Sequence, residues 1–110
     1  MTHRAPLAQE SCRPLGPQDR LAGDALAALM AQVPQWQVID GSLQRSLRFP
    51  DFHRTMAFVN AAAFVAHQQD HHPDLSVGYD HCTLRFSTHS AGGLTRNDVI
   101  CAARIDALLA

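Results

Sequence analysis

Residues 50–70 read PDFHRTMAFVNAAAFVAHQQD and predict one long helix in the middle of the chain. Apolar side chains recur there at the spacing of a single helix face: Phe52, Met56, Val59, Ala63 and Ala66. Further apolar residues widen this stripe: Phe58, Ala62 and Val65. Pro50 lies at or near the first turn, where its missing N–H is tolerated. The helix is expected to fade from Gln68 to Asp70.

A helix and a strand pair are predicted before this segment. Apolar residues recur at helical spacing over residues 20–33, and a proline follows. Residues 36–39 and 43–49 flank Asp40-Gly41, and Asp-Gly between two short apolar runs is a strong hairpin signal. The apolar residues of the second run share one parity, and Arg45 falls out of that pattern.

A second strand pair and a last helix are predicted after the central helix. The strands are expected at residues 75–79 and 82–88. The second of them alternates apolar and polar residues, which is typical of a half-exposed strand. Thr95 is a good N-cap with Asp98 three residues later, and the helix that it opens is expected to run to about Leu109.

The predicted order is therefore α-β-β-α-β-β-α. Helices and hairpins in this order predict an α+β protein with a four-stranded antiparallel sheet and three helices packed on one face. The length of 110 residues is enough for one domain, which we place at residues 18–110. Residues 1–17 contain three prolines and little apolar periodicity, so they predict a flexible N-terminal lead-in.

Composition excludes several classes of protein. A formal net charge of −1 argues against the basic face that nucleic-acid binding needs. No apolar run approaches the roughly 18 residues of a membrane span, and the N-terminus lacks the apolar core of a signal peptide, so a cytoplasmic protein is expected. Cys12, Cys82 and Cys101 form no CxxC pair and predict buried or free thiols rather than a disulfide framework.

The sequence His71-His72-Pro73 carries the strongest chemical signal. Two adjacent imidazoles titrate near neutral pH, so each can give or take a proton there. Pro73 biases His72 toward an extended backbone, in which neighbouring side chains point to opposite faces. We therefore expect His71 and His72 to do different jobs, with His89 and Asp98 as further members of the site.

Other chemistries have weaker support. His67 and His71 are spaced i, i+4, and other residues could complete a metal site, namely Asp70, His72, Cys82 and His89. The segment nevertheless lacks the glutamate that marks zinc hydrolases. No serine lies in a Gly-x-Ser-x-Gly elbow. All nine basic residues are arginines, which disfavours Schiff-base chemistry. Acid/base catalysis by histidines with carboxylate support remains.

These residues occur in a longer pattern that resembles a known family. The longer pattern runs Asp70-His71-His72-Pro73, five residues, Tyr79, nine residues, His89, eight residues and Asp98. It resembles the signature of pterin-4a-carbinolamine dehydratases. The flanking stretches agree, namely residues 29–36, 49–52 and 87–95. The resemblance covers about residues 20–110. Position 67 is often acidic in that family and is histidine here.

The resemblance implies a fold, an activity and a site. The fold is a four-stranded antiparallel sheet with three helices, in a dimer or tetramer. The activity is dehydration of 4a-hydroxytetrahydropterin to the quinonoid dihydropterin, after an aromatic amino-acid hydroxylase has used the pterin, with no metal or other cofactor. His71, His72 and His89 are implied as catalytic residues. The implied substrate-binding residues are Trp36, which flanks the pterin, Asp70, Pro73 and Asp98, which supports the site.

A second class of function is open on the same fold. The resemblance also covers relatives that act as transcription-factor partners or as assembly proteins of a carbon-fixing enzyme, and these often lose catalytic histidines. All three histidines and Asp98 are present here, which favours the enzyme. We expect a homo-oligomer, with the tetramer slightly favoured, because the central helix is apolar around much of its circumference.

Overall fold

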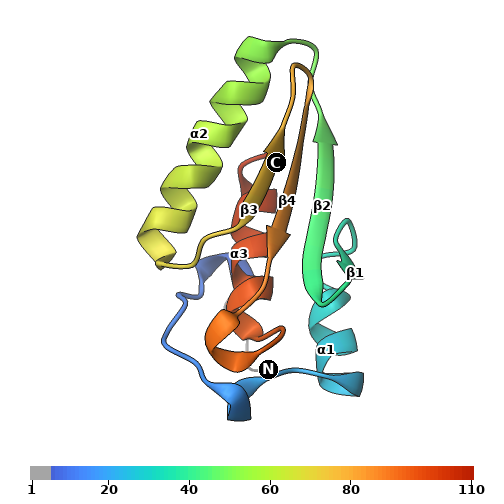
Figure 1. Cartoon of the computed structure of the whole chain (residues 1–110), viewed down its shortest axis with the longest axis vertical. Helices are drawn as coiled ribbons and strands as arrows, with labels where there is room; N and C mark the ends of the chain where they lie inside the picture. Colours follow the sequence, from blue (N-terminus) through green and yellow to red (C-terminus); the bar gives the residue numbers. More distant parts are fainter. Residues whose placement is uncertain (1–5) are drawn as a thin grey trace.

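A computed structural model of the chain describes residues 6–110 (Figure 1). Residues 1–5 of the predicted lead-in lie outside this range. Three α-helices and four strands follow one another in the predicted order. The helices are α1 (Gly23–Met30), α2 (Phe52–Gln69) and α3 (Arg96–Ala107). The strands are β1 (Gln37–Ile39), β2 (Ser42–Arg48), β3 (Asp74–Val77) and β4 (His81–Phe86). The α+β class and its element order are confirmed.

The sheet is antiparallel, with the strand order β1-β2-β4-β3. Asp40 and Gly41 connect β1 to β2 with φ values of 50° and 77°. Positive φ at both central residues is what a type I′ hairpin turn requires, and Asp-Gly meets that requirement. The predicted first hairpin is therefore confirmed. The two long strands at the centre, β2 and β4, pair from Leu43↔Phe86 to Arg48↔His81.

One face of the sheet is covered by the helices, and α3 lies behind β3 and β4 in Figure 1. The side chains of β4 alternate as predicted, with Cys82, Leu84 and Phe86 fully buried while Thr83 and Arg85 are partly exposed. Burial on alternate residues is expected of a strand whose two faces meet different surroundings. The core therefore lies between this face of the sheet and α3, five residues of which are both apolar and buried.

The buried stripe of α2 differs from the predicted one. Phe52 and Ala63 of the predicted stripe are exposed, so that part of the prediction is wrong. The buried residues are Thr55, Phe58, Ala62, Val65 and Ala66, so the residues that widened the predicted stripe form most of the buried face. Thr55 joins this face with backbone partners, since its hydroxyl lies 2.8 Å from the oxygen of Asp51 and 2.9 Å from the oxygen of Tyr79. A polar residue with a backbone partner can occupy a buried stripe.

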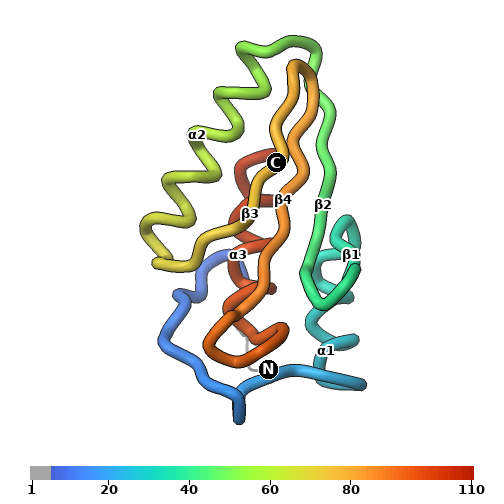
Figure 2. The backbone as a smooth tube through the Cα atoms, in the orientation of Figure 1, coloured from blue at the N-terminus to red at the C-terminus, as the bar shows by residue number. Residues whose placement is uncertain are grey.

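Residues 6–20 form a strap along α3, and we call this segment the N-terminal strap. Figure 2 shows it (blue) passing from α3, beside the end of α2, to the start of α1. Leu7 is buried, and Arg96 makes a two-pronged contact with Glu10 at 2.8 Å through each nitrogen. Arg104 donates to the backbone oxygen of Glu10. The strap thus has a defined path, and its predicted flexibility remains a prediction.

Arg45 interrupts the apolar pattern of β2 because its side chain has a partner on the side of the sheet that the helices cover. Its guanidinium contacts Asp106 of α3 at 2.5 Å, and the indole N–H of Trp36 donates to the same carboxylate oxygen at 2.8 Å. Asp106 therefore joins β2, the start of β1 and the last turns of α3. None of the helices in residues 6–110 is long and apolar enough to cross a bilayer.

We expect Asp106→Ala to lower the free energy of unfolding by about 1–3 kcal/mol, because it leaves a largely buried arginine and an indole N–H without their acceptor. Asp80→Ala is the matched control, since Asp80 pairs with Arg48 at the exposed surface, where water screens the pair and its loss has little effect on stability. Urea unfolding of both variants measures the difference. Equal losses would show that the Asp106 cluster is not a structural anchor.

Candidate active site

The segment that carries the two adjacent histidines begins where α2 ends. Asp70 adopts the left-handed conformation, with φ 49° and ψ 42°, and the N–H of His71 donates back to the oxygen of Ala66 at 3.2 Å. Such a bond closes a helix C-terminus, and aspartate is one of the few side chains that accept this conformation. The chain then turns into β3, so His71 and His72 lie on an extended link between helix and strand.

This ending separates His67 from His71. His67 stays on the last turn of α2, whereas His71 lies beyond the helix, so the i, i+4 pair considered for a metal does not form on one helix face. Within residues 6–110 no cluster of three or more His, Cys, Asp or Glu side chains is arranged to hold a metal ion.

His71 is held by a buried carboxylate. Its Nε2 lies 2.6 Å from Oδ1 of Asp98, which is fully buried at the start of α3. Its ring stacks on Phe86 of β4, with ring centroids 5.9 Å apart and planes 8° from parallel. A charge-assisted hydrogen bond and a flat aromatic neighbour together determine how the imidazole is oriented.

The other carboxylate oxygen of Asp98 also accepts hydrogen bonds. Its Oδ2 accepts from the hydroxyl of Thr88 at 2.8 Å and from the backbone N–H of Thr95 at 2.9 Å. Thr95 and Asp98 form the predicted capping box at the N-terminus of α3. Asp98 has no exposed surface and contacts the pocket lining through His71 and Thr88, so the substrate-binding role expected for it stays a prediction without support from this geometry.

The pKa of His71 is raised above its ordinary value of 6.5. Burial of the ring favours the neutral form and lowers the pKa, but the hydrogen bond that the imidazole donates to Asp98 and the negative charge of that carboxylate raise the pKa by more. The protonated form of His71 is therefore more favoured than that of an ordinary histidine.

An open pocket of about 390 Å³ brings the histidines together. The residues that line it come from the link after α2 and from the segment after β4: Asp70, His71, His72, Pro73, Asp74, Ser87, Thr88, His89 and Ser90. His72 and His89 are exposed, whereas His71 forms the inner wall. Among the predicted site residues, the pocket thus gathers three histidines, Asp70 and Pro73, with Asp98 directly behind.

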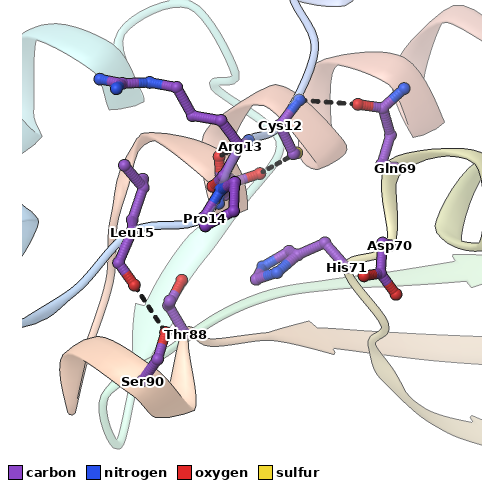
Figure 3. A pocket seen from close by; sticks show the side chains of 10 residues that line it. Cys12, Arg13, Pro14, Leu15, Gln69, Asp70, His71, Thr88 and Ser90 are labelled. Atoms are coloured by element: carbon purple, nitrogen blue, oxygen red, sulfur yellow. Dashed lines mark hydrogen bonds between the residues drawn. The ribbon is translucent and has the colours of Figure 1, made fainter.

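A second hollow of about 260 Å³ adjoins this pocket on the side of the strap. It shares Asp70, His71, Thr88 and Ser90 with the first. Figure 3 shows His71 facing residues 12–15 of the strap across it. Sequence reasoning missed this wall, because the strap meets Asn97 and Ser90 across sequence separations of 84 and 75 residues and no local pattern signals such contacts.

Trp36 is placed elsewhere. Its side chain is only 3% exposed, its N–H is bonded to Asp106, and it is absent from the lining of the histidine pocket. Its ring lies 5.9 Å from Phe86, so Trp36 and His71 contact the same core aromatic. The contacts assign Trp36 to the core, and its role beside a pterin stays a prediction without support from this geometry.

Fold and site together define a small α+β protein with a pocket lined by three imidazoles. A sequence model described as "Pterin 4 alpha carbinolamine dehydratase" matches residues 19–108. The chain belongs to this family. A provisionally named pterin-4-alpha-carbinolamine dehydratase from Stenotrophomonas maltophilia is 51% identical, with 98% of this chain and 96% of the relative covered. One from Chromobacterium violaceum is 48% identical, with 93% and 94% covered.

Two solved structures are also similar. The crystal structure of a transcriptional coactivator/pterin dehydratase from Brucella melitensis superposes with a TM-score of 0.78 at 29% identity, covering 83% of this chain and 99% of that one. A pterin dehydratase-like protein identified as a RuBisCO assembly factor of the alpha-carboxysome has a TM-score of 0.55 at 24% identity, covering 66% and 84%. The second likeness concerns the fold alone. The chain is thus pterin-4a-carbinolamine dehydratase-like.

We expect Asp98→Asn to lower the pKa of His71, because the amide carries no charge while the burial that disfavours the imidazolium remains. Asp70→Asn is the control, since Asp70 contributes least to the raised value. Titration of the histidine ring protons by NMR measures both. An unchanged His71 in Asp98→Asn would refute the assignment of its raised pKa to this carboxylate.

The same pair makes stability depend on pH. The pKa of His71 is raised in the folded protein. The stabilisation that its pair with Asp98 contributes is therefore complete below the pKa of about 6.5 in the unfolded chain, and it is lost as pH rises through the pKa in the folded protein. His71→Gln should therefore lower the free energy of unfolding more at pH 5 than at pH 9, by about 1–3 kcal/mol at the lower pH. Urea unfolding at both pH values tests this, and an equal loss at each would contradict it.

Proposed function

We propose that this chain dehydrates 4a-hydroxytetrahydropterin to quinonoid dihydropterin and water, with His71, His72 and His89 as its acid and base groups. The observation that carries the proposal is one open pocket lined by three imidazoles, of which one is oriented by a fully buried carboxylate. Family membership supports the pterin substrate.

The proposed reaction needs only proton transfers. The substrate carries a hydroxyl and an amine on carbon 4a, and the C–O bond breaks as the N5 lone pair forms a C=N bond. The leaving hydroxyl takes a proton and departs as water, while N5 loses its proton. Positioned acid and base groups contribute roughly 10²–10⁴-fold each to such a step. Imidazoles with an ordinary pKa near 6.5 suit both roles at neutral pH.

We assign the acid roles to His71 and His89. His71 suits an acid because Asp98 favours its protonated form. His89 reaches the pocket from the segment after β4, whereas His71 and His72 reach it from the link after α2. Two acids from different segments could protonate hydroxyls of either stereochemistry. His72, next to Pro73, is assigned to the base role or to orientation of the pterin.

We further propose that the protein is a homo-oligomer, as a tetramer or a dimer. Large apolar side chains remain exposed on α2 and at the hairpin of β3 and β4: Phe52, Phe64, Leu75, Val77 and Tyr79. Phe64 is 61% exposed, and exposed apolar groups of this size usually mark an interaction surface. Phe58 and Val65, which widen the predicted apolar stripe, are core residues and do not contribute to this exposed surface. Light scattering at micromolar concentration tests the proposal, and a single-chain mass would refute it.

A cellular role follows from the proposed chemistry. The substrate arises when an aromatic amino-acid hydroxylase uses its tetrahydropterin, so we place the chain in pterin recycling in the cytoplasm. The alternative is a binding or assembly protein on the same fold, like the coactivator and assembly relatives. The intact histidine pocket supports the enzyme, and the activity assay separates the two.

We expect the purified protein to accelerate dehydration of freshly generated 4a-hydroxytetrahydropterin, followed by ultraviolet absorbance. His71→Ala and His89→Ala should each lose about 10- to 100-fold and keep partial activity, because each acid can partly replace the other. The double variant should fall near the uncatalysed rate.

His53→Ala is the control, since His53 is exposed in the first turn of α2 and lies outside the pocket. Circular dichroism confirms that each variant is folded. A wild-type rate equal to the uncatalysed one would refute the enzyme. Complete loss in both single variants would show instead that the two histidines form one relay.

A further inference from the structure

Two thiols from opposite ends of the chain meet beside the pocket. Sγ of Cys12, in the N-terminal strap, lies 3.6 Å from Sγ of Cys101, in α3. Cys101 follows Asp98 by three residues, so both lie on the same side of the helix. The pair therefore connects the strap to the element that orients His71.

The strap holds Cys12 at this point through several bonds. The backbone N–H of Cys12 donates to the side chain of Gln69 at 2.8 Å. Asn97 accepts from the N–H of Arg13 at 3.2 Å and donates to the oxygen of the same residue at 2.7 Å. The thiol pair is thus held by polar contacts on both sides of Cys12.

We propose that Cys12 and Cys101 are a redox modification site, at which a peroxide converts the two thiols to an intrachain disulfide that fastens the N-terminal strap to α3.

The two thiols differ in access, as such a site requires. Cys12 is half-buried and lines the hollow that opens beside His71, so a small oxidant can reach it. Cys101 is fully buried, and its Sγ contacts Cys12 from the side of α3. A disulfide needs the sulfurs at about 2.05 Å, so they must approach by roughly 1.5 Å. The strap is a surface segment without an α-helix or strand, and such segments adjust more readily than a packed helix.

Electrostatics favour Cys12 as the attacking thiol. The hydrogen bond from Cys101 lowers the pKa of Cys12, and the charges of His71 and Arg104 lower it further against the effect of burial. The pKa of Cys101 is raised by the same hydrogen bond and by its burial. The thiolate is the reactive form, so reaction begins at the more accessible sulfur.

The chemistry balances with one peroxide. The Cys12 thiolate attacks a peroxide oxygen, the O–O bond breaks, and hydroxide leaves and becomes water by taking a proton. Cys12 is then a sulfenic acid. Sγ of Cys101 attacks Sγ of Cys12, the S–O bond breaks, and the departing hydroxide takes the Cys101 proton. Two thiols and one peroxide give one disulfide and two waters.

The site is independent of the proposed dehydratase function. Cys12 lies outside residues 19–108, which the family model matches. The disulfide would fix residues 12–15 as one wall of the hollow beside His71.

Treatment of the folded, reduced protein with one equivalent of hydrogen peroxide tests the proposal. We expect the loss of two of three thiols, an intact mass lower by two hydrogens, and a tryptic peptide of residues 5–20 joined to residues 97–104. Cys82→Ser is the matched control and should behave like the wild type, because Cys82 lies in β4. Cys12→Ser and Cys101→Ser should each abolish the joined peptide.

A second readout is protection of the strap. Trypsin should cut after Arg20 about tenfold more slowly in the oxidised protein, because cleavage requires local opening of the strap that the disulfide restrains. Dithiothreitol should restore both the thiols and the cleavage rate. Retention of all three thiols, a disulfide between two chains, or oxidation of Cys12 to sulfinic acid without a joined peptide would each overturn the proposal.

Discussion

The buried carboxylate of Asp98 is the interaction on which both fold and site depend. An ionised carboxylate without partners is among the most costly groups to bury. Here its oxygens accept from Thr88 and from the N–H of Thr95, and a third contact comes from His71. The positive end of the α3 dipole adds to these contacts. The cap that starts the last helix is thus also the group that orients His71, so formation of the native helix end and orientation of this imidazole at the pocket are coupled.

The opposite end of α3 is anchored in the same manner. Asp106 accepts from Trp36 and Arg45, which come from the first hairpin region, and Arg96 and Arg104 hold the strap by Glu10. Segments from the beginning, middle and end of the chain therefore converge on one 12-residue helix. Strands β3 and β1 bury none of their side chains, and α3, α2 and β4 supply most of the buried side chains of the helices and strands.

Local patterns in the sequence predicted what local geometry determines. Asp40-Gly41 satisfies the turn that it occupies, alternation in β4 reflects one covered face, and Thr95 with Asp98 reads directly as a capping box. The burial of Thr55 on α2 was not predictable, because one of its partners is a backbone oxygen 24 residues away. For the site, the histidine motif was visible, but the 27-residue contact between His71 and Asp98 and the wall made by the strap arise only after folding.

One aromatic ring is shared between the interior and the pocket. Phe86 is fully buried and contacts Trp36 on one side and His71 on the other. A description of the site that considers only its titratable groups would therefore overlook the effect of a substitution at Phe86. A smaller side chain there would loosen the His71 ring as well as the core. Under the proposed dehydratase function, activity would then fall although every histidine of the pocket is intact, so Phe86 would matter to the site without holding a titratable atom.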